Sequence, residues 1–334
     1  QKILLLKREK VRWVVQNGNV FFPAYLILHS IMIRFFCLMY SMAITSGIVN
    51  GQSSSGHFLP SNQGNKTLLW EVSGGNLTKP SYFLGTMHIL CPEDAFLSGA
   101  VLQILDTVDA VYFELDLDNM GQMMAAMQHM AMLNDTTLSD LLTPEEIAKV
   151  KAALADKLPL PFQVLERFKP MLISGLLSEQ LLPCKAGAGT EMLIMDAASK
   201  RQLPTVGLET PAYQFSLFDK IPYTEQAKSL VKSLDTLSNE GEKMVGEMLT
   251  AFQQQDLEEL AKLTQSEESG IEGYADILLN DRNRNWVEKF VELSEKKTNL
   301  YAVGAGHLPG EAGVLKLLEQ KGYKLRPLLN QKPQ

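Results

Sequence analysis

Two Gly-x-x-His motifs, each directly after a short apolar segment, constrain the fold of this chain more than any other feature. The first follows residues 82–84 and ends at His88, and the second follows residues 300–303 and ends at His307. Short apolar runs that stop at a glycine are typical of buried β-strands. The glycines allow the backbone to turn sharply and to pass close to a bound group. The two motifs therefore predict two strands that each deliver a histidine.

Two glutamates occupy similar places after other apolar segments. Residues 111–113 lead into Glu114, and residues 206–208 lead into Glu209. A helical pattern from Pro92 to about Leu105 separates the first histidine strand from the first glutamate strand, and this order predicts a parallel sheet. Parallel strands open their carboxyl ends onto one edge, where ligands bind. The four strands are therefore expected to direct two imidazoles and two carboxylates toward one edge.

The remaining pattern predicts a mixed α/β (α+β) fold. We expect a central mixed sheet from the N- and C-terminal segments, with a large helical middle section. The expected strands are residues 67–72, 81–86, 110–115, 203–208, 299–303 and 323–328. The first two are expected to form a hairpin through the turn Gly74-Gly75-Asn76.

The charge of the chain argues against nucleic-acid partners. Its 334 residues are 46% hydrophobic and 21% charged, as in globular proteins. Residues 1–51 hold six of the basic residues and one acid, so the remainder has 25 bases and 37 acids. A body with this acidic excess repels phosphate backbones.

The first 66 residues have the pattern of an export segment. Residues 32–51 contain an arginine, then an apolar run, then small residues, which predicts a signal peptide. Residues 1–31 are interpreted as an upstream extension, residues 52–66 as a flexible leader, and residues 67–329 as a single domain. We expect a periplasmic or extracellular protein. The alternative is an uncleaved membrane anchor over residues 13–49, which would be the only membrane contact.

Two cysteines, Cys91 and Cys184, lie outside the signal segment. In an oxidising compartment the pair permits one disulfide, but two separate free thiols are equally compatible with the sequence. Both alternatives remain open at this level.

The histidines and glutamates predict a metal site. Two histidines and a carboxylate are a common ligand set for first-row metals, and this set leaves positions open for water. His88, Glu114 and His307 are the expected ligands, with Glu209 as general base or orienting residue. The alternative is purely structural, because a single Gly-x-x-His is most often a turn with a surface histidine.

One expected helix, residues 276–290, carries Arg282 and Asn283 a turn before Trp286. Either these residues face solvent, or the arginine turns inward to hold a carboxylate or an oxyanion. Glu191, at the start of another expected helix, is interpreted as a helix-start charge.

Several longer segments, taken in order, carry a family resemblance. They are LLWEV, YFLGTMH, FELD at 113–116, PTVGLET at 204–210, DRNRNW at 281–286 and VGAGHLPGEAGVLKLLEQKGY at 303–323. Across residues 67–329 the chain resembles the TraB/GumN family, which is similar to the TIKI-type Wnt-inactivating metalloproteases. The resemblance implies metal-dependent peptidase chemistry, with Mn²⁺ or Co²⁺ favoured and Zn²⁺ as a further candidate. It also implies that His88, His307 and the essential Glu114 form the site, with Arg282 and Asn283 as the late Arg-Asn pair.

These observations lead to two functional hypotheses. The first is an exported metal-dependent hydrolase that cleaves a peptide or protein substrate, with Arg282 and Asn283 stabilising the oxyanion. The second is a non-catalytic module that binds a peptide or haem at the same edge. In that case the methionine-rich residues 120–133 would supply apolar contacts.

Overall fold

The computed structural model describes residues 66–88, 90–155, 160–178, 181–184, 189–236, 240–265 and 273–333, together with short strands between residues 7 and 21. The chain divides into two compact units, residues 1–48 and 49–334. The predicted signal peptide at 32–51 and nearly all of the predicted leader lie outside the described residues.

The first unit contains two small antiparallel pairs. Strand β1 (Lys7–Arg8) pairs with β2 (Val11–Arg12), and β3 (Val14–Gln16) pairs with β4 (Asn19–Phe21). In the part of the chain that the structure describes, we find no helix with the length and apolar character needed to span a bilayer.

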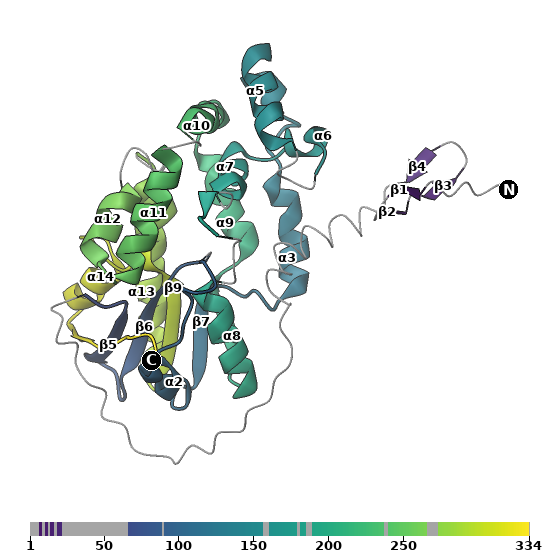
Figure 1. Ribbon diagram of the computed structural model, residues 1–334. Helices are drawn as coiled ribbons and strands as arrows, with labels where there is room; N and C mark the ends of the chain where they lie inside the picture. The colour runs from purple at the N-terminus through teal and green to yellow at the C-terminus, as the bar shows by residue number, and fades with distance from the viewer. Residues whose placement is uncertain are drawn as a thin grey trace. The chain divides into compact units, whose positions relative to one another are not determined.

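The second unit is built on one mixed sheet, which confirms the predicted α/β class (Figure 1). Within the described residues its strands are β5 (Leu69–Gly74), β6 (Ser81–Thr86), β7 (Ala110–Leu115), β8 (Thr205–Glu209), β9 (Asn299–Gly304) and β10 (Tyr323–Pro327). Their order is β10-β5-β6-β9-β7-β8. Strands β6, β9, β7 and β8 are mutually parallel, whereas β5 runs antiparallel to both of its neighbours.

The predicted hairpin joins β5 to β6. Gly74 and Gly75 have φ values of +80° and +55°, which favour glycine. A Cβ atom on Gly75 would lie 2.7 Å from the ring of Tyr323, so the side chain is excluded by space as well as by conformation.

Helices form the connections. Between β6 and β7 lies α2 (Gly99–Leu105), and between β7 and β8 lie α3 (Met120–Ala126), η1 (Met127–Met130), α4 (Leu138–Leu141), α5 (Pro144–Leu154), α6 (Phe162–Leu165), α7 (Pro170–Ser178) and α8 (Thr190–Lys200). Between β8 and β9 lie α9 (Pro211–Leu217), η3 (Phe218–Lys220), α10 (Tyr223–Thr236), α11 (Glu240–Gln253), α12 (Leu257–Gln265), the π-helical turn η5 (Asp276–Asn280) and α13 (Asp281–Ser294). The turn η6 (Ala305–His307) and α14 (Val314–Gln320) complete the chain.

Two helical expectations need correction. The helix expected from Pro92 begins only at Gly99, because the Ser98 side chain accepts a hydrogen bond from the Val101 N–H and sets the start there. The helix expected over 276–290 is a π-helical turn followed by α13, so the residues before Asp281 are not regular α-helix.

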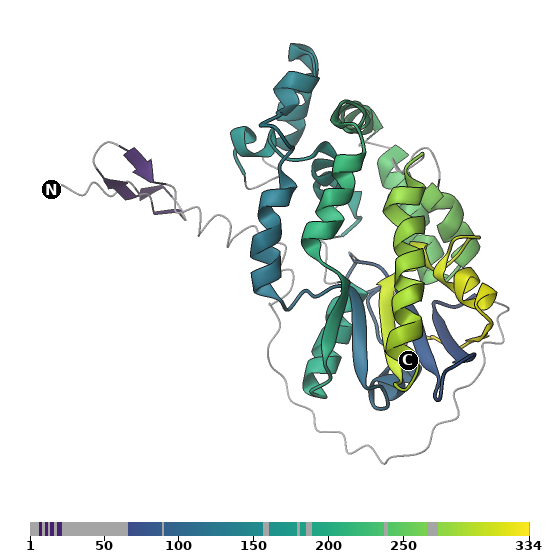
Figure 2. The same ribbon diagram turned by 180° about the vertical axis from the view of Figure 1, so that it is seen from behind.

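Apolar residues cover both faces of the sheet. On one face, α2 and α8 pack on Leu84, Val111 and Leu300. On the other face, α13 and α14 pack on Phe83 and Tyr301. Figure 2 shows α13, in yellow-green, running across this face of the sheet. Burial on both faces explains why the parallel strands are continuous apolar runs rather than alternating ones. A third apolar cluster holds α4, α5, α6, α7 and α10 together.

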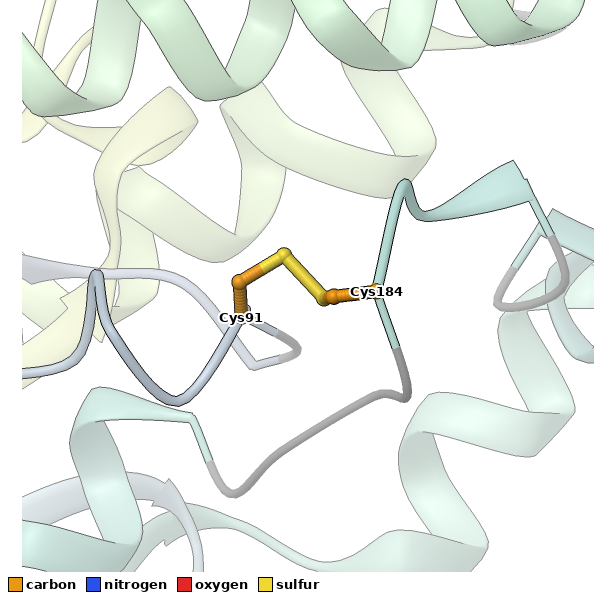
Figure 3. Close-up of a disulfide and its surroundings, with 2 residues drawn as sticks. All are labelled: Cys91 and Cys184. Atoms are coloured by element: carbon orange, nitrogen blue, oxygen red, sulfur yellow. A yellow bond between two sulfur atoms is a disulfide. The ribbon is translucent and has the colours of Figure 1, made fainter.

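Cys91 and Cys184 form a disulfide, which settles the alternative left open by the sequence (Figure 3). The two sulfur atoms are 2.06 Å apart, and the bond joins residues 93 positions apart in the chain. It links the loop that follows β6 to the segment that precedes α8.

Candidate functional site

The carboxyl ends of the four parallel strands lie at one edge of the sheet. The register pairs Thr86 of β6 with Gly304 of β9, and Leu115 of β7 with Glu209 of β8. Glu114 is the penultimate residue of β7. Strand direction alone therefore brings the histidine and glutamate segments to the same edge, as the sequence predicts.

Arg282 lies at the centre of a buried polar cluster at this edge. Its Nη2 donates to Glu114 Oε2 at 2.6 Å, and its Nε donates to Glu209 Oε2 at 2.9 Å. Arg282 is only 8% exposed, and both glutamates are similarly buried. One planar guanidinium thus pairs with two buried carboxylates, which would each be costly without a partner. Of the two readings of Arg282, the inward orientation is the observed one.

The π-helical turn before α13 helps to orient this arginine. Leu278 lies in that turn, and its carbonyl oxygen accepts a hydrogen bond of 3.0 Å from Arg282 Nη1. Trp286, one turn further along α13, places its ring 4.8 Å from the guanidinium carbon. Three kinds of group therefore hold the guanidinium: the two carboxylates, the Leu278 carbonyl and the Trp286 ring.

His307 lies next to Arg282 in a single defined tautomer. Arg282 Nη1 is 3.2 Å from His307 Nε2, and because a guanidinium can only donate, Nε2 is the acceptor. His307 Nδ1 then carries the proton, which it donates to Asn283 Oδ1 at 2.6 Å. The Asn283 amide is itself oriented by the hydrogen bond that its Nδ2 donates to the Ala312 carbonyl. Burial lowers the pKa of His307 to about 3, so the ring is neutral near pH 7.

Glu114 remains ionised in the same cluster. Burial by itself raises its pKa, but Arg282, together with His307 once that ring is protonated at low pH, outweighs the effect and holds the pKa well below its ordinary value. The Gly304 N–H donates to Glu114 Oε1 at 2.8 Å, and a Cβ at residue 304 would lie 3.0 Å from that oxygen. The glycine of the second motif therefore allows the backbone to approach the carboxylate. His307 Nε2 lies 3.8 Å from Glu114 Oε1.

Glu209 has one oxygen engaged and one unengaged. Oε2 accepts from Arg282 and from Gln214 Nε2 at 3.1 Å. Oε1 is buried, and none of the residues that the structure describes supplies it with a hydrogen bond. Gln214, which also lies 3.4 Å from Glu114 Oε2, was missed by the sequence analysis, because a single glutamine on a short helix carries no distinctive pattern.

His88 lies at the same edge but has a different partner. Its Nδ1 is 2.7 Å from Glu191 Oε1, and its side chain is 65% exposed. Glu191 is the principal cause that raises the pKa of His88 to about 9. Glu191 does lie in the first turn of α8, as expected, but it is only 5% exposed and is paired with His88. Its role as a partner of His88 was not recognisable from its position in the sequence.

The six predicted site residues are therefore divided. Glu114, Glu209, Arg282, Asn283 and His307 form one connected cluster, the polar centre, whereas His88 pairs with Glu191. In the described ranges, no group of three or more His, Cys, Asp or Glu side chains is arranged so that it could hold a metal ion.

The fold and this cluster define an α/β protein with a charged polar centre at the carboxyl edge of its parallel strands. The chain belongs to the TraB/PrgY/gumN family, whose model matches residues 68–327. No curated protein and no solved structure matches the chain.

Proposed function

We propose that this protein is an exported metal-dependent hydrolase that cleaves peptide bonds. The observation that carries the proposal is the polar centre, where one arginine, two carboxylates and a neutral imidazole converge in a buried site at the strand ends. Two carboxylates against one guanidinium leave an excess of negative charge, which suits a bound divalent cation, and the charges and dipoles of the centre are fixed before any reaction.

The donor chemistry of the two histidines fits a divalent metal ion. Each imidazole is held through Nδ1 by a side-chain oxygen, from Glu191 for His88 and from Asn283 for His307. Metal-binding histidines are usually held in this way, with the other ring nitrogen bound to the metal. At His307 an ion would have to replace the hydrogen bond that Nε2 accepts from Arg282. His88, Glu114 and His307 are the residues that would hold the ion. Mn²⁺ or Co²⁺ is favoured by the family resemblance, and Zn²⁺ is a further candidate. A bound ion would supply Lewis acidity, which polarises a carbonyl and makes water more acidic.

The chain's own residues have separate roles in this proposal. Glu209 Oε1, buried and without a partner, is placed to accept a proton from the attacking water. Arg282 offsets the charge that develops on the carbonyl oxygen. Asn283 has both ends of its amide engaged, with His307 and with Ala312, so we assign it to fixing the His307 tautomer rather than to the oxyanion.

The disulfide supports the export part of the proposal. Stable disulfides are typical of the periplasm and of extracellular space, and rare in reducing compartments. The Cys91–Cys184 bond therefore agrees with a periplasmic or extracellular location, with the predicted signal peptide at 32–51 as the route.

Calorimetric titration of the full chain with Mn²⁺, Co²⁺ and Zn²⁺ tests the metal site. We expect one bound ion per chain, lost in His307→Ala and retained in His129→Ala, a histidine outside the polar centre. Unchanged binding in the double variant His88→Ala plus His307→Ala would remove the metal assignment.

Cleavage of a peptide library in the presence of Mn²⁺ tests the reaction. Products that disappear in Glu114→Gln support the hydrolase. Tight peptide binding without products, or a Soret band on adding haem, would instead indicate the non-catalytic module.

A further inference from the structure

Glu191 is a buried carboxylate that is directed at an exposed histidine. Its Oε1 accepts hydrogen bonds from His88 Nδ1 at 2.7 Å and from Thr86 Oγ1 at 2.6 Å. Glu191 is 5% exposed, whereas the His88 side chain is 65% exposed. A carboxylate that served only as a helix-start charge would remain exposed to water, because burying a carboxylate has a desolvation cost.

The second oxygen of Glu191 strengthens this point. Oε2 is buried, and among the described residues it has no hydrogen-bond partner. An unpartnered buried oxygen is destabilising, so a side chain that keeps one is expected to have a compensating role. That role is to hold His88 and Thr86, because both donate hydrogen bonds to the other oxygen, Oε1.

The backbones that carry the two residues are also in contact. The Thr190 N–H donates to the Met87 carbonyl oxygen at 3.1 Å. A Cβ on Gly189 would lie 2.1 Å from the His88 carbonyl oxygen, so only glycine fits there. This close approach fixes Glu191, two residues after Gly189, beside His88.

The disulfide joins the same two segments covalently (Figure 3). Cys91 lies three residues after His88, and Cys184 precedes the Gly189–Glu191 segment. Side-chain pairing, backbone contact and a covalent bond therefore all connect the His88 loop to the start of α8.

We propose that Glu191 is a positioning residue for His88, and that the Cys91–Cys184 disulfide maintains the pair. Glu191 accepts a hydrogen bond from Nδ1 of His88 and thereby fixes the ring, so that Nε2, on losing its own proton, is the nitrogen left for a ligand of the site. The inference rests on the proposed function only in treating His88 as part of that site.

Two measurements on the full chain test it. The first is Co²⁺ affinity by calorimetry, with Glu191→Ala, the conservative Glu191→Gln, and Glu71→Ala as a matched control. Glu71 also carries a carboxylate paired with a base, Arg326, but it lies on β5. We expect Glu191→Ala to weaken Co²⁺ binding by about 10- to 100-fold, Glu191→Gln to restore part of the loss, and Glu71→Ala to change only the melting temperature.

The second measurement is ¹⁵N NMR of the histidine rings in the metal-free chain. We expect the hydrogen-bonded Nδ1 proton of His88 to be observed in the wild type and lost in Glu191→Ala. The corresponding His307 proton, held by Asn283, serves as an internal control and stays unchanged. If Glu191→Ala does not fold, Glu191→Gln gives the same comparison with a smaller expected change.

The outcomes separate this inference from the proposed function. A wild-type chain that binds no Co²⁺ would overturn the metal site, yet the ring spectra would still decide the role of Glu191. Identical His88 ring signals in the wild type and in Glu191→Ala would overturn the positioning role, whatever the metal data show.

Discussion

At the scale of single residues, the polar centre is held together by the hydrogen bonds that the charged Arg282 side chain donates. Arg282 contacts Glu114, Glu209 and His307 together. Its flat, permanently charged fork can bond both carboxylates and still donate to Nε2 of the imidazole. Lysine, a point charge on a flexible stem, could not reproduce these directions.

Removal of this guanidinium is expected to be strongly destabilising. Arg282→Ala would leave Glu114 and Glu209 buried without a cation, so we expect the free energy of unfolding to fall by about 3–5 kcal/mol. Urea denaturation measures the loss. The control is Arg284→Ala, two residues away, where an exposed arginine pairs with Asp281 and the expected change is within about 0.5 kcal/mol. A loss below about 1 kcal/mol in Arg282→Ala would contradict the assigned role.

The His88–Glu191 pair predicts a pH dependence of stability. The pKa of His88 is raised to about 9 in the folded chain, from an ordinary value of 6.5, so the folded state holds the proton more tightly than the unfolded state. Its stabilising effect is complete below about pH 6.5 and is lost as the pH rises through about 9. We expect denaturation midpoints of the wild type to fall between pH 6 and pH 10 by more than those of His88→Gln. Equal falls in the two chains would show that the pair contributes nothing to stability.

At the scale of elements, individual hydrogen bonds and one disulfide fix the helix starts and the loops around the site. Ser98 fixes the start of α2, and Gly304 lets the turn after β9 approach Glu114. The π-helical turn at Asp276–Asn280 supplies the carbonyl that orients Arg282. The disulfide performs the same task between the His88 loop and α8.

Loss of the disulfide is therefore expected to cost stability. Cross-linking residues 93 positions apart restricts the unfolded chain strongly, and we expect the double variant Cys91→Ser, Cys184→Ser to lose about 2–5 kcal/mol of unfolding free energy. Reductant should produce the same loss in the wild type and none in the variant. Equal stability of the oxidised and reduced wild type would contradict this expectation.

At the scale of the whole molecule, the sheet order decides which residues meet. The sequence predicts the parallel strands that precede Glu114 and His88, but it does not predict that β9 lies between them. The observed order β6-β9-β7 inserts a C-terminal strand into the middle of the sheet. That insertion brings Gly304 and His307 next to Glu114, since β9 and β7 are paired neighbours.

The sequence by itself determined the strands, the α/β class and the placing of glutamates at strand ends and of histidines just after them. Apolar run length and glycine position are local properties, and the carboxyl ends of parallel strands share one edge by geometry. Only the tertiary structure decided that Arg282 joins two carboxylates, that Glu191 pairs with His88 and that Cys91 bonds Cys184. Those contacts join residues far apart in the chain, and their partners are chosen by packing, which no local pattern records.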